Sequence, residues 1–311
     1  MDTAPCLLYT FAVCIRQGGF SLLFHQIHHR IAIRDHHSCW CAIIILLVVS
    51  FCTGATALAA TPPEVTADAA IVVDTGSGRV LYEKNADQRE YPASMTKIMT
   101  CLLAIESGRL GSVVEVSPNA ADVESTRMHP GDQVRMQDLL TQMMLISDNG
   151  AATAVGEALG GGDIDYFAER MNRQAASLGM NNTHFVNANG MPDPAHYSTA
   201  RDMERLAQAA FQNKIFRKIV STKASNIYYI RPAGRVEYCV NTNELLDTYD
   251  GIVGGKTGWT NAARGCLTAA ADRNGHELIV VVMHSDDDES RFVEAAALLD
   301  YGFSQIVENN S

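Results

Sequence analysis

Apolar and polar positions alternate along the chain in two rhythms, which predict strands near both ends and helices between them. Residues 70–74 are an apolar, β-branched run, and residues 79–83 alternate after a Thr-Gly-Ser-Gly turn, so a β-hairpin is expected there. Residues 266–270 and 278–283 flank Arg-Asn-Gly and predict a second hairpin. Residues 226–230 are also strand-like.

Apolar residues spaced three and four apart predict helices over residues 94–107, 136–146, 149–159, 164–178, 201–212 and 289–301. Gly108 follows the first of these in the way a helix-ending glycine does. Residues 181–199 form a polar loop of a length that is often functional.

This order of elements predicts an α/β (α+β) fold, in which a mainly antiparallel sheet built from both ends of the chain is flanked by helices. We expect one domain over residues 60–311 with a mainly helical insertion at about 120–220. No β-rich second domain is expected after it.

The first 59 residues differ from the rest and predict an export signal. Residues 40–52 (WCAIIILLVVSFC) have the length of a signal-peptide core, and Ala57-Leu58-Ala59 is a small-x-small cleavage pattern. We therefore expect an exported protein of the cell envelope, cut near Ala59. An uncleaved membrane anchor is the alternative. Five histidines precede the apolar run, and we favour a start codon placed too early over a metal-binding tract.

Charge excludes some functions. The chain has 35 acidic and 24 basic residues, and residues 60–311 carry 21 bases against 33 acids, a net charge of −12. So acidic a body argues against nucleic-acid binding and against docking on an anionic membrane. Three cysteines in the body, widely spaced, suggest neither a zinc site nor a disulfide scaffold, although a single bridge stays open.

Ser94 and Lys97 are the first candidate chemical pair. These two residues are three positions apart at a predicted helix start, so their Cβ atoms would lie roughly 5–6 Å apart on one face of the helix. A serine hydroxyl needs a neighbouring base to become a nucleophile, and a lysine can serve if burial or a nearby cation lowers its pKa. The helix-start amides would favour a developing oxyanion. The alternative is a helix-capping serine beside a solvated lysine.

Lys256, Thr257 and Gly258 form the second candidate. On an edge strand, Lys256 would offer a fixed positive charge, Thr257 a hydroxyl, and Gly258 room for a substrate backbone to approach. A substrate carboxylate suits this arrangement. The alternative is a hairpin turn with an exposed lysine.

Ser147 and Asn149 form the third candidate, at a junction between two predicted helices. A loop there would project into a cleft. The alternative is that one of them only caps the second helix.

The order S-x-x-K, S-x-N, K-T-G is far more specific than any one of its parts. With Tyr91-Pro92-Ala93-Ser94-Met95-Thr96-Lys97, residues 184–187 (HFVN), residues 196–203 (HYSTARDM) and residues 298–303 (LLDYGF), it resembles the low-molecular-weight penicillin-binding proteins, which are serine D-alanyl-D-alanine carboxypeptidases. The resemblance covers about residues 65–305 and implies the penicillin-binding protein/β-lactamase-like transpeptidase fold.

The resemblance implies a role for each catalytic candidate. Ser94 would be acylated by the carbonyl of the penultimate D-Ala of a peptidoglycan stem peptide, with Lys97 as its base. Ser147 and Asn149 would line the cleft, and Ser147 would relay a proton to the leaving amine.

It also implies the substrate contacts. Lys256, Thr257 and Arg291 would bind the terminal carboxylate, and the backbone amides of Ser94 and Trp259 would form an oxyanion hole. β-Lactam antibiotics would be covalent inhibitors. No metal or organic cofactor is implied.

Three departures from the family pattern stand out. Arg264 occupies a position that is often glycine, and Trp259 is bulky enough to narrow access to the cleft. We also expect neither the β domain nor the amphipathic anchor that many members carry after LLDYGF.

The sequence leaves three other functions to consider as alternatives. A D,D-endopeptidase acting on cross-links uses the same chemistry with another leaving group. A class A β-lactamase needs a deacylating glutamate, and residues 181–199 contain none. A catalytically silent penicillin-recognising module is disfavoured by intact Ser94, Lys97 and Lys256.

Overall fold

The computed structural model describes residues 61–308. The predicted leader, residues 1–59, lies outside the described residues. In the described part, no helix is both long and apolar enough to cross a membrane.

The centre of the fold is a five-stranded antiparallel sheet with the strand order β2-β1-β9-β8-β7. Its strands are β1 (Ala69–Asp74), β2 (Arg79–Lys84), β7 (Ile252–Thr260), β8 (Arg264–Arg273) and β9 (His276–Ser285). Both predicted hairpins are present, and the two ends of the chain meet where β1 pairs with β9. β7, which carries Lys256-Thr257-Gly258, is an edge strand, as the carboxylate-binding interpretation of this segment requires, and not a hairpin turn.

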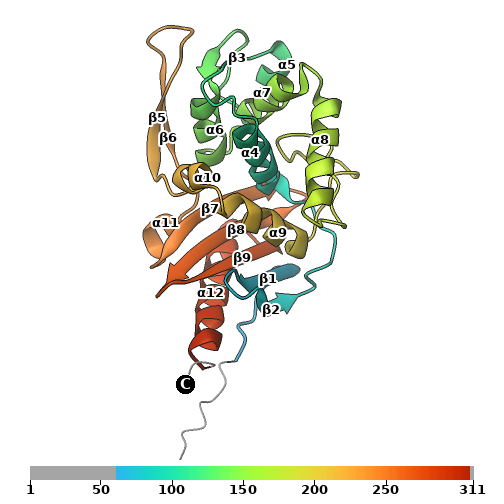
Figure 1. The fold of residues 1–311 in the computed structure, drawn as a ribbon, viewed down its shortest axis with the longest axis vertical. Coiled ribbons are helices and arrows are strands. Elements are labelled where there is room, and N and C mark those ends of the chain that lie inside the picture. Colours follow the sequence, from blue (N-terminus) through green and yellow to red (C-terminus); the bar gives the residue numbers. More distant parts are fainter. Residues whose placement is uncertain (1–60, 309–311) are drawn as a thin grey trace, which may run out of the picture. The chain divides into compact units, whose positions relative to one another are not determined.

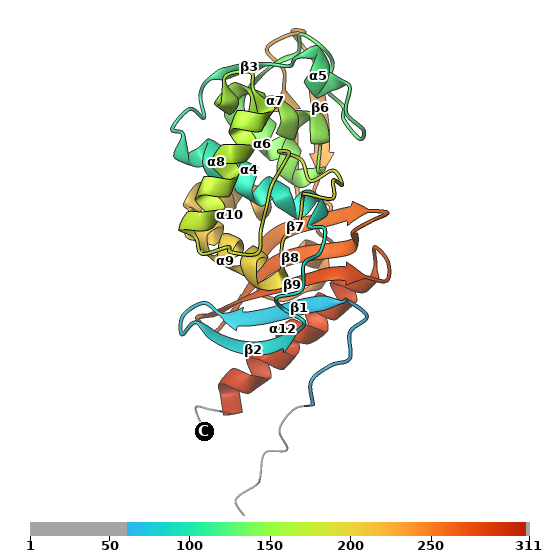
Figure 2. The same cartoon turned by 90° about the vertical axis from the view of Figure 1, so that its right-hand side faces the viewer.

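Helices cover both faces of the sheet, which explains why the inner strands β1, β8 and β9 are buried and mostly apolar along their middle residues. In β1, Ile71 and Val73 point into the core shared with the helical body, whereas Ala70 and Val72 point into the core under α12 (Ser290–Glu308). Figure 2 shows α12 on one side of the sheet and α4, α6, α7, α8, α9 and α10, all within residues 97–220, on the opposite side. α9 (Ala200–Phe211) packs against β1, β8 and β9 on that second side. α11 (Leu245–Thr248) belongs to the α12 side, because Leu245 is buried in the same core as α12.

The helical body surrounds one central helix (Figure 1). α4 (Lys97–Glu106) contacts α6 (Met136–Leu145), α7 (Asn149–Gly160), α8 (Ile164–Ser177), α9 and α10 (Lys214–Val220). Its residues from Lys97 to Ile105 are all buried. A helix that is apolar on every side belongs in a core, and α4 therefore carries its first residue, Lys97, into the interior.

The remaining elements are small. They are β3 (Val113–Glu115), α5 (Pro118–Ala121), β4 (Gln133–Arg135), β5 (Ala224–Tyr228), β6 (Val236–Val240) and α11 (Leu245–Thr248). β3 pairs with β4, and β5 pairs with β6 to form a hairpin beside α6. The predicted strand near 226–230 is therefore one arm of a hairpin whose second arm the apolar pattern did not indicate.

Predicted boundaries were wrong at two helices. The helix expected over residues 289–301 continues to Glu308. The helix expected to begin at Ser94 starts instead with a 3₁₀ turn, η1 (Ala93–Thr96), and becomes α-helical at Lys97. Such tight turns are common at helix N-termini. Here the turn begins at Ala93, whose φ of +46° is unusual for a residue other than glycine.

Candidate active site

Ser94 lies in the η1 turn, half-buried, where three chain segments meet. Gly190 lies so close to this turn that a Cβ atom there would be 1.9 Å from the carbonyl oxygen of Ala93. A Cβ atom on Gly258 would be 3.2 Å from the backbone nitrogen of Ser94. Glycine at both positions therefore lets the 181–199 loop and the edge strand β7 close on the serine from two sides.

Lys97 is completely buried directly behind Ser94. Its Nζ lies 2.7 Å from Ser94 Oγ, 2.6 Å from Asn149 Oδ1 and 2.6 Å from the backbone oxygen of Asn189. The predicted Ser–Lys pair is therefore in contact, and the alternative of a solvated lysine is excluded by burial. The amide of Asn149 is itself fixed, because its Nδ2 donates to the backbone oxygen of Glu124 at 2.9 Å.

The surroundings of Lys97 favour a neutral amine. Burial lowers the pKa of Lys97 well below its usual value, and the positive charge of nearby Lys256 lowers it further. The carboxylate of Asp148 acts in the opposite direction but is the smaller influence. A lysine without its proton can accept one, which is what a serine nucleophile needs from its neighbour.

Ser147 lies on the turn between α6 and α7, and Asn149 is the first residue of α7, so both are at the helix junction that the sequence predicted. Asp148 is the residue that caps α7, through the backbone nitrogen of Ala151. Asp148 also accepts hydrogen bonds from Thr126 Oγ1 and Gln142 Nε2. The turn is thus anchored through its middle residue, and Ser147, with a φ of +61°, lines the pocket beside Ser94.

The Lys-Thr-Gly segment forms the opposite wall. Lys256 is buried, and its Nζ donates to the backbone oxygen of Thr257 at 2.9 Å. Burial, with a contribution from the positive charge of Arg291, lowers the pKa of Lys256 to about 7. The hydroxyl of Thr257 lies 2.6 Å from that of Thr242, which connects this wall to the segment after β6.

Arg291 reaches the same pocket from the first turn of α12. Its Nη1 donates to the backbone oxygen of Gly258 at 3.0 Å and forms an ion pair with Asp288 at 2.5 Å. Its Nε is buried and has no protein partner. Burial lowers the pKa of Arg291, yet a guanidinium stays charged at neutral pH.

These groups surround one pocket of about 270 Å³. The residues lining it are Ser94, Ser125, Ile146, Ser147, Asn149, Thr242, Thr257, Gly258, Trp259, Asp288 and Arg291. Lys97 and Lys256 lie just behind this lining and touch it through Ser94 and Thr257. The structure therefore brings all the candidate residues to one place, although they come from four separate parts of the sequence.

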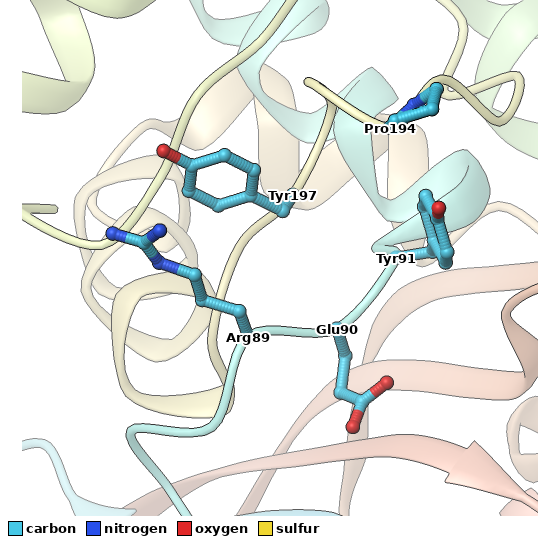
Figure 3. Close-up of a pocket in the computed structure, with 5 residues that line it drawn as sticks. All are labelled: Arg89, Glu90, Tyr91, Pro194 and Tyr197. Carbon is cyan, nitrogen blue, oxygen red and sulfur yellow. The ribbon is translucent and has the colours of Figure 1, made fainter.

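A second hollow, of about 310 Å³, lies beside the segment that leads into Ser94. Figure 3 shows Arg89 next to the ring of Tyr197, with Tyr91 and Pro194 further along. The guanidinium of Arg89 is 4.4 Å from the centre of that ring. No candidate catalytic residue lines this hollow.

Several residues of the site were not predicted from the sequence. Asn189 contributes only its backbone oxygen, which has no signature in the side-chain pattern, although the Asn-Gly pair at 189–190 marks a turn. Thr242 and Asp288 line the pocket but stand outside the recognised motifs. Arg264, which departs from the family pattern, has a φ of +51°, a backbone conformation that glycine adopts more easily. Trp259, the other bulky departure, lines the pocket and is 42% exposed.

A serine hydroxyl against a buried lysine, facing a Lys-Thr-Gly edge strand, defines a serine hydrolase that uses lysine where others use histidine. The family model described as D-alanyl-D-alanine carboxypeptidase, peptidase family S11, matches residues 56–287. The chain belongs to this family.

Individual relatives agree. The D-alanyl-D-alanine carboxypeptidase of Streptomyces sp. strain K15 is 34% identical over 268 residues, which cover 81% of this chain and 92% of the relative. DacF of Bacillus subtilis is 34% identical, and the match spans 77% of this chain but only 62% of DacF. A D-alanyl-D-alanine endopeptidase of Escherichia coli is 30% identical over 78% of this chain and 79% of its own length.

Solved structures confirm the fold. The crystal structure of the Streptomyces K15 DD-transpeptidase superposes with a TM-score of 0.75 at 32% identity, covering 79% of this chain and all of that one. A putative penicillin-binding protein homologue of Mycobacterium tuberculosis gives a TM-score of 0.74. The predicted fold class, family and serine-peptidase class are therefore all confirmed.

Proposed function

We propose that the protein removes the terminal D-Ala from peptidoglycan stem peptides through an acyl-enzyme on Ser94. The observation that carries this proposal is the set of three contacts around Lys97 Nζ. A neutral amine has two N–H donors and one lone pair. The two oxygens of Asn149 and Asn189 can take the two donors, which leaves the lone pair directed at the hydroxyl of Ser94.

Acylation follows from this arrangement. Ser94 Oγ attacks the carbonyl carbon of the penultimate D-Ala while its proton passes to Lys97 Nζ. The oxyanion of the tetrahedral intermediate forms beside the backbone amides of Ser94 and Trp259. The C–N bond then breaks, and the leaving amine of the terminal D-Ala takes a proton through Ser147. Water hydrolyses the ester and restores Ser94.

The terminal carboxylate of the substrate would bind between Thr257, Lys256 and Arg291. Arg291 and the hydroxyl of Thr257 line one end of the pocket, and Lys256 adds a positive side chain directly behind Thr257, an arrangement that suits such a group. Binding of this carboxylate would also place the scissile peptide bond next to Ser94, because the carboxylate belongs to the residue that follows that bond.

A β-lactam would acylate the same serine. No glutamate stands in the 181–199 loop to direct a deacylating water, so the acyl-enzyme is expected to be long-lived. Action on such substrates is expected outside the cytoplasm, in keeping with an export signal in the first 59 residues. N-terminal sequencing of the mature protein tests that localisation.

Substrate choice is tested by mass spectrometry of a peptidoglycan digest that contains pentapeptides and cross-linked dimers. We expect pentapeptides to lose one alanine while dimers persist. Conversion of dimers to monomers would instead assign the protein as an endopeptidase. The similarity to the E. coli endopeptidase is the observation that supports this second candidate. No change in either species would contradict the proposal.

Replacing Lys256 with alanine is expected to raise KM for D-Ala-D-Ala peptides about ten- to a hundredfold, since hydrogen bonds to charged groups contribute roughly 1.5–3 kcal/mol. Acylation by an uncharged ester should change much less. Steady-state kinetics on the two substrates measures the difference. Equal losses on both would remove the carboxylate-binding role of Lys256.

The pKa of Lys256 gives this role a pH dependence. Because that pKa is lowered to about 7, the side chain is charged below pH 7 and neutral above it. In the wild type, kcat/KM for carboxylate substrates, which reports the free enzyme, is expected to fall as the pH rises through about 7. The Lys256→Ala variant should lack this fall. A similar fall with an uncharged ester would assign it to another group.

A further inference from the structure

Asp288 is the only carboxylate among the described residues that line the active-site pocket. It lies just before α12 and is followed three positions later by Arg291. Its side chain is 58% exposed, whereas that of Arg291 is only 8% exposed. One partner of this ion pair is therefore at the mouth of the pocket and the other is in its wall.

We infer that Asp288 occupies Arg291 in the empty enzyme and is displaced when the carboxylate of the substrate binds, so that it sets the affinity for carboxylate-ended substrates. This inference rests on the proposed function. It adds a specificity-determining residue that competes with the substrate for the same guanidinium.

The energetics of Arg291 explain why such a residue would be present. A buried guanidinium without a partner is costly, because it has lost water and gained nothing in return. Its Nη1 is shared between Asp288 and the backbone oxygen of Gly258, and its Nε has no protein partner. Asp288 thus supplies the one negative charge on Arg291 from the pocket side while the site is empty.

The same contact is weak enough to exchange. Ion pairs with a solvent-exposed partner contribute only about 0–1 kcal/mol, because water competes for the exposed group. A substrate carboxylate held at the same time by Lys256 and Thr257 would have more partners than Asp288 has, so it would win the exchange. Asp288 can swing outward at little cost, since most of its side chain already faces solvent.

Two readings of Asp288 predict opposite results. If it competes, Asp288→Asn should lower KM for an N-acylated tripeptide ending in D-Ala-D-Ala by about three- to fivefold, the factor that corresponds to an exposed ion pair. If Asp288 only orients Arg291 for the substrate, the same variant should raise KM. In either case kcat is expected to change little.

The experiment measures kcat and KM for that peptide and for the same peptide with its carboxylate blocked as an ester. The matched control is Asp286→Asn, which removes the same charge two residues away from an exposed pair with Arg264 outside the pocket. We expect a lower KM only for the Asp288 variant and only with the free carboxylate. A lower KM with Asp286→Asn as well, or with the ester, would assign the effect to general charge and overturn the inference.

A double variant separates direct competition from a long-range effect on Lys256. In an Arg291→Met background, Asp288→Asn should leave KM unchanged, because nothing remains to compete for. A persisting decrease would contradict the inference. Wild-type enzyme that fails to release D-Ala from the peptide would contradict the proposed function itself, whereas release combined with a raised KM in Asp288→Asn would overturn only the role of Asp288.

Discussion

Replacing Ser94 with alanine is expected to abolish covalent labelling by penicillin and to reduce release of D-Ala by at least about 10⁴-fold, the scale seen when a serine nucleophile is removed. We expect no other hydroxyl of the pocket to replace Ser94 as the nucleophile, because Ser94 has the one hydroxyl that contacts Lys97 Nζ among the described residues. Intact-mass spectrometry after incubation with a β-lactam measures the adduct directly.

The matched control is Ser107→Ala at the far end of the same helix. Its hydroxyl donates to the backbone oxygen of Ala104 and accepts from the backbone nitrogen of Arg109, and it does not line the pocket. This variant should be labelled as fast as the wild type. Ser94→Ala should stay folded, since it loses a single hydrogen bond from a half-buried side chain, worth about 1 kcal/mol. A stoichiometric adduct on folded Ser94→Ala would show that another nucleophile reacts.

Replacing Lys97 with methionine is expected to slow acylation by about 10²–10⁴-fold, the usual contribution of a general base. Methionine matches the buried stem of lysine but has no nitrogen to accept the proton of Ser94. Stopped-flow measurement of acylation by a fluorescent penicillin gives the rate. The variant also leaves the oxygens of Asn149 and Asn189 without their donor, so a loss of stability of about 1–3 kcal/mol for each is expected.

Lys97→Arg distinguishes a base from a mere positive charge. A guanidinium stays protonated at any pH that a protein tolerates, so it keeps the charge but cannot accept a proton. If Lys97 is the base, this variant should be as slow as Lys97→Met. Acylation close to the wild-type rate in folded Lys97→Arg would contradict the base role and point to electrostatic stabilisation by a cation.

The motifs of the site could be predicted from the sequence because each consists of a few side chains that lie close together along the chain. Ser94 and Lys97 are three residues apart at a helix start, and Lys256, Thr257 and Gly258 are consecutive on a strand. That these distant segments meet in one site was predicted from the order of the three motifs along the chain. No single motif would have been specific enough for that prediction. The edge position of β7 was a condition of the carboxylate-binding interpretation of Lys256, and the sequence left a hairpin turn open as the alternative.

What could not be predicted depends on backbone groups and on residues outside the motifs. The oxygen of Asn189 holds Lys97, yet any residue type has such an oxygen. The 3₁₀ turn at Ser94 reflects the crowding of Ala93 between Gly190 and Gly258, two segments distant in sequence. In β6, the second strand of the β5–β6 hairpin, the exposed positions Val236, Tyr238 and Val240 are apolar, so apolar and polar residue types do not alternate with burial.

The central claim is that Lys97 is a neutral amine against Ser94 at neutral pH, and the titration of its side chain tests this most directly. The chain contains only six lysines, so their ¹³Cε resonances can be resolved after isotopic labelling, and the signal missing from Lys97→Met identifies residue 97. We predict that this signal has the chemical shift of an uncharged amine at pH 7 and that it titrates far below 10.5, because burial and Lys256 lower its pKa. A signal of a charged ammonium at pH 7 that loses its proton only near pH 10.5 would contradict the account.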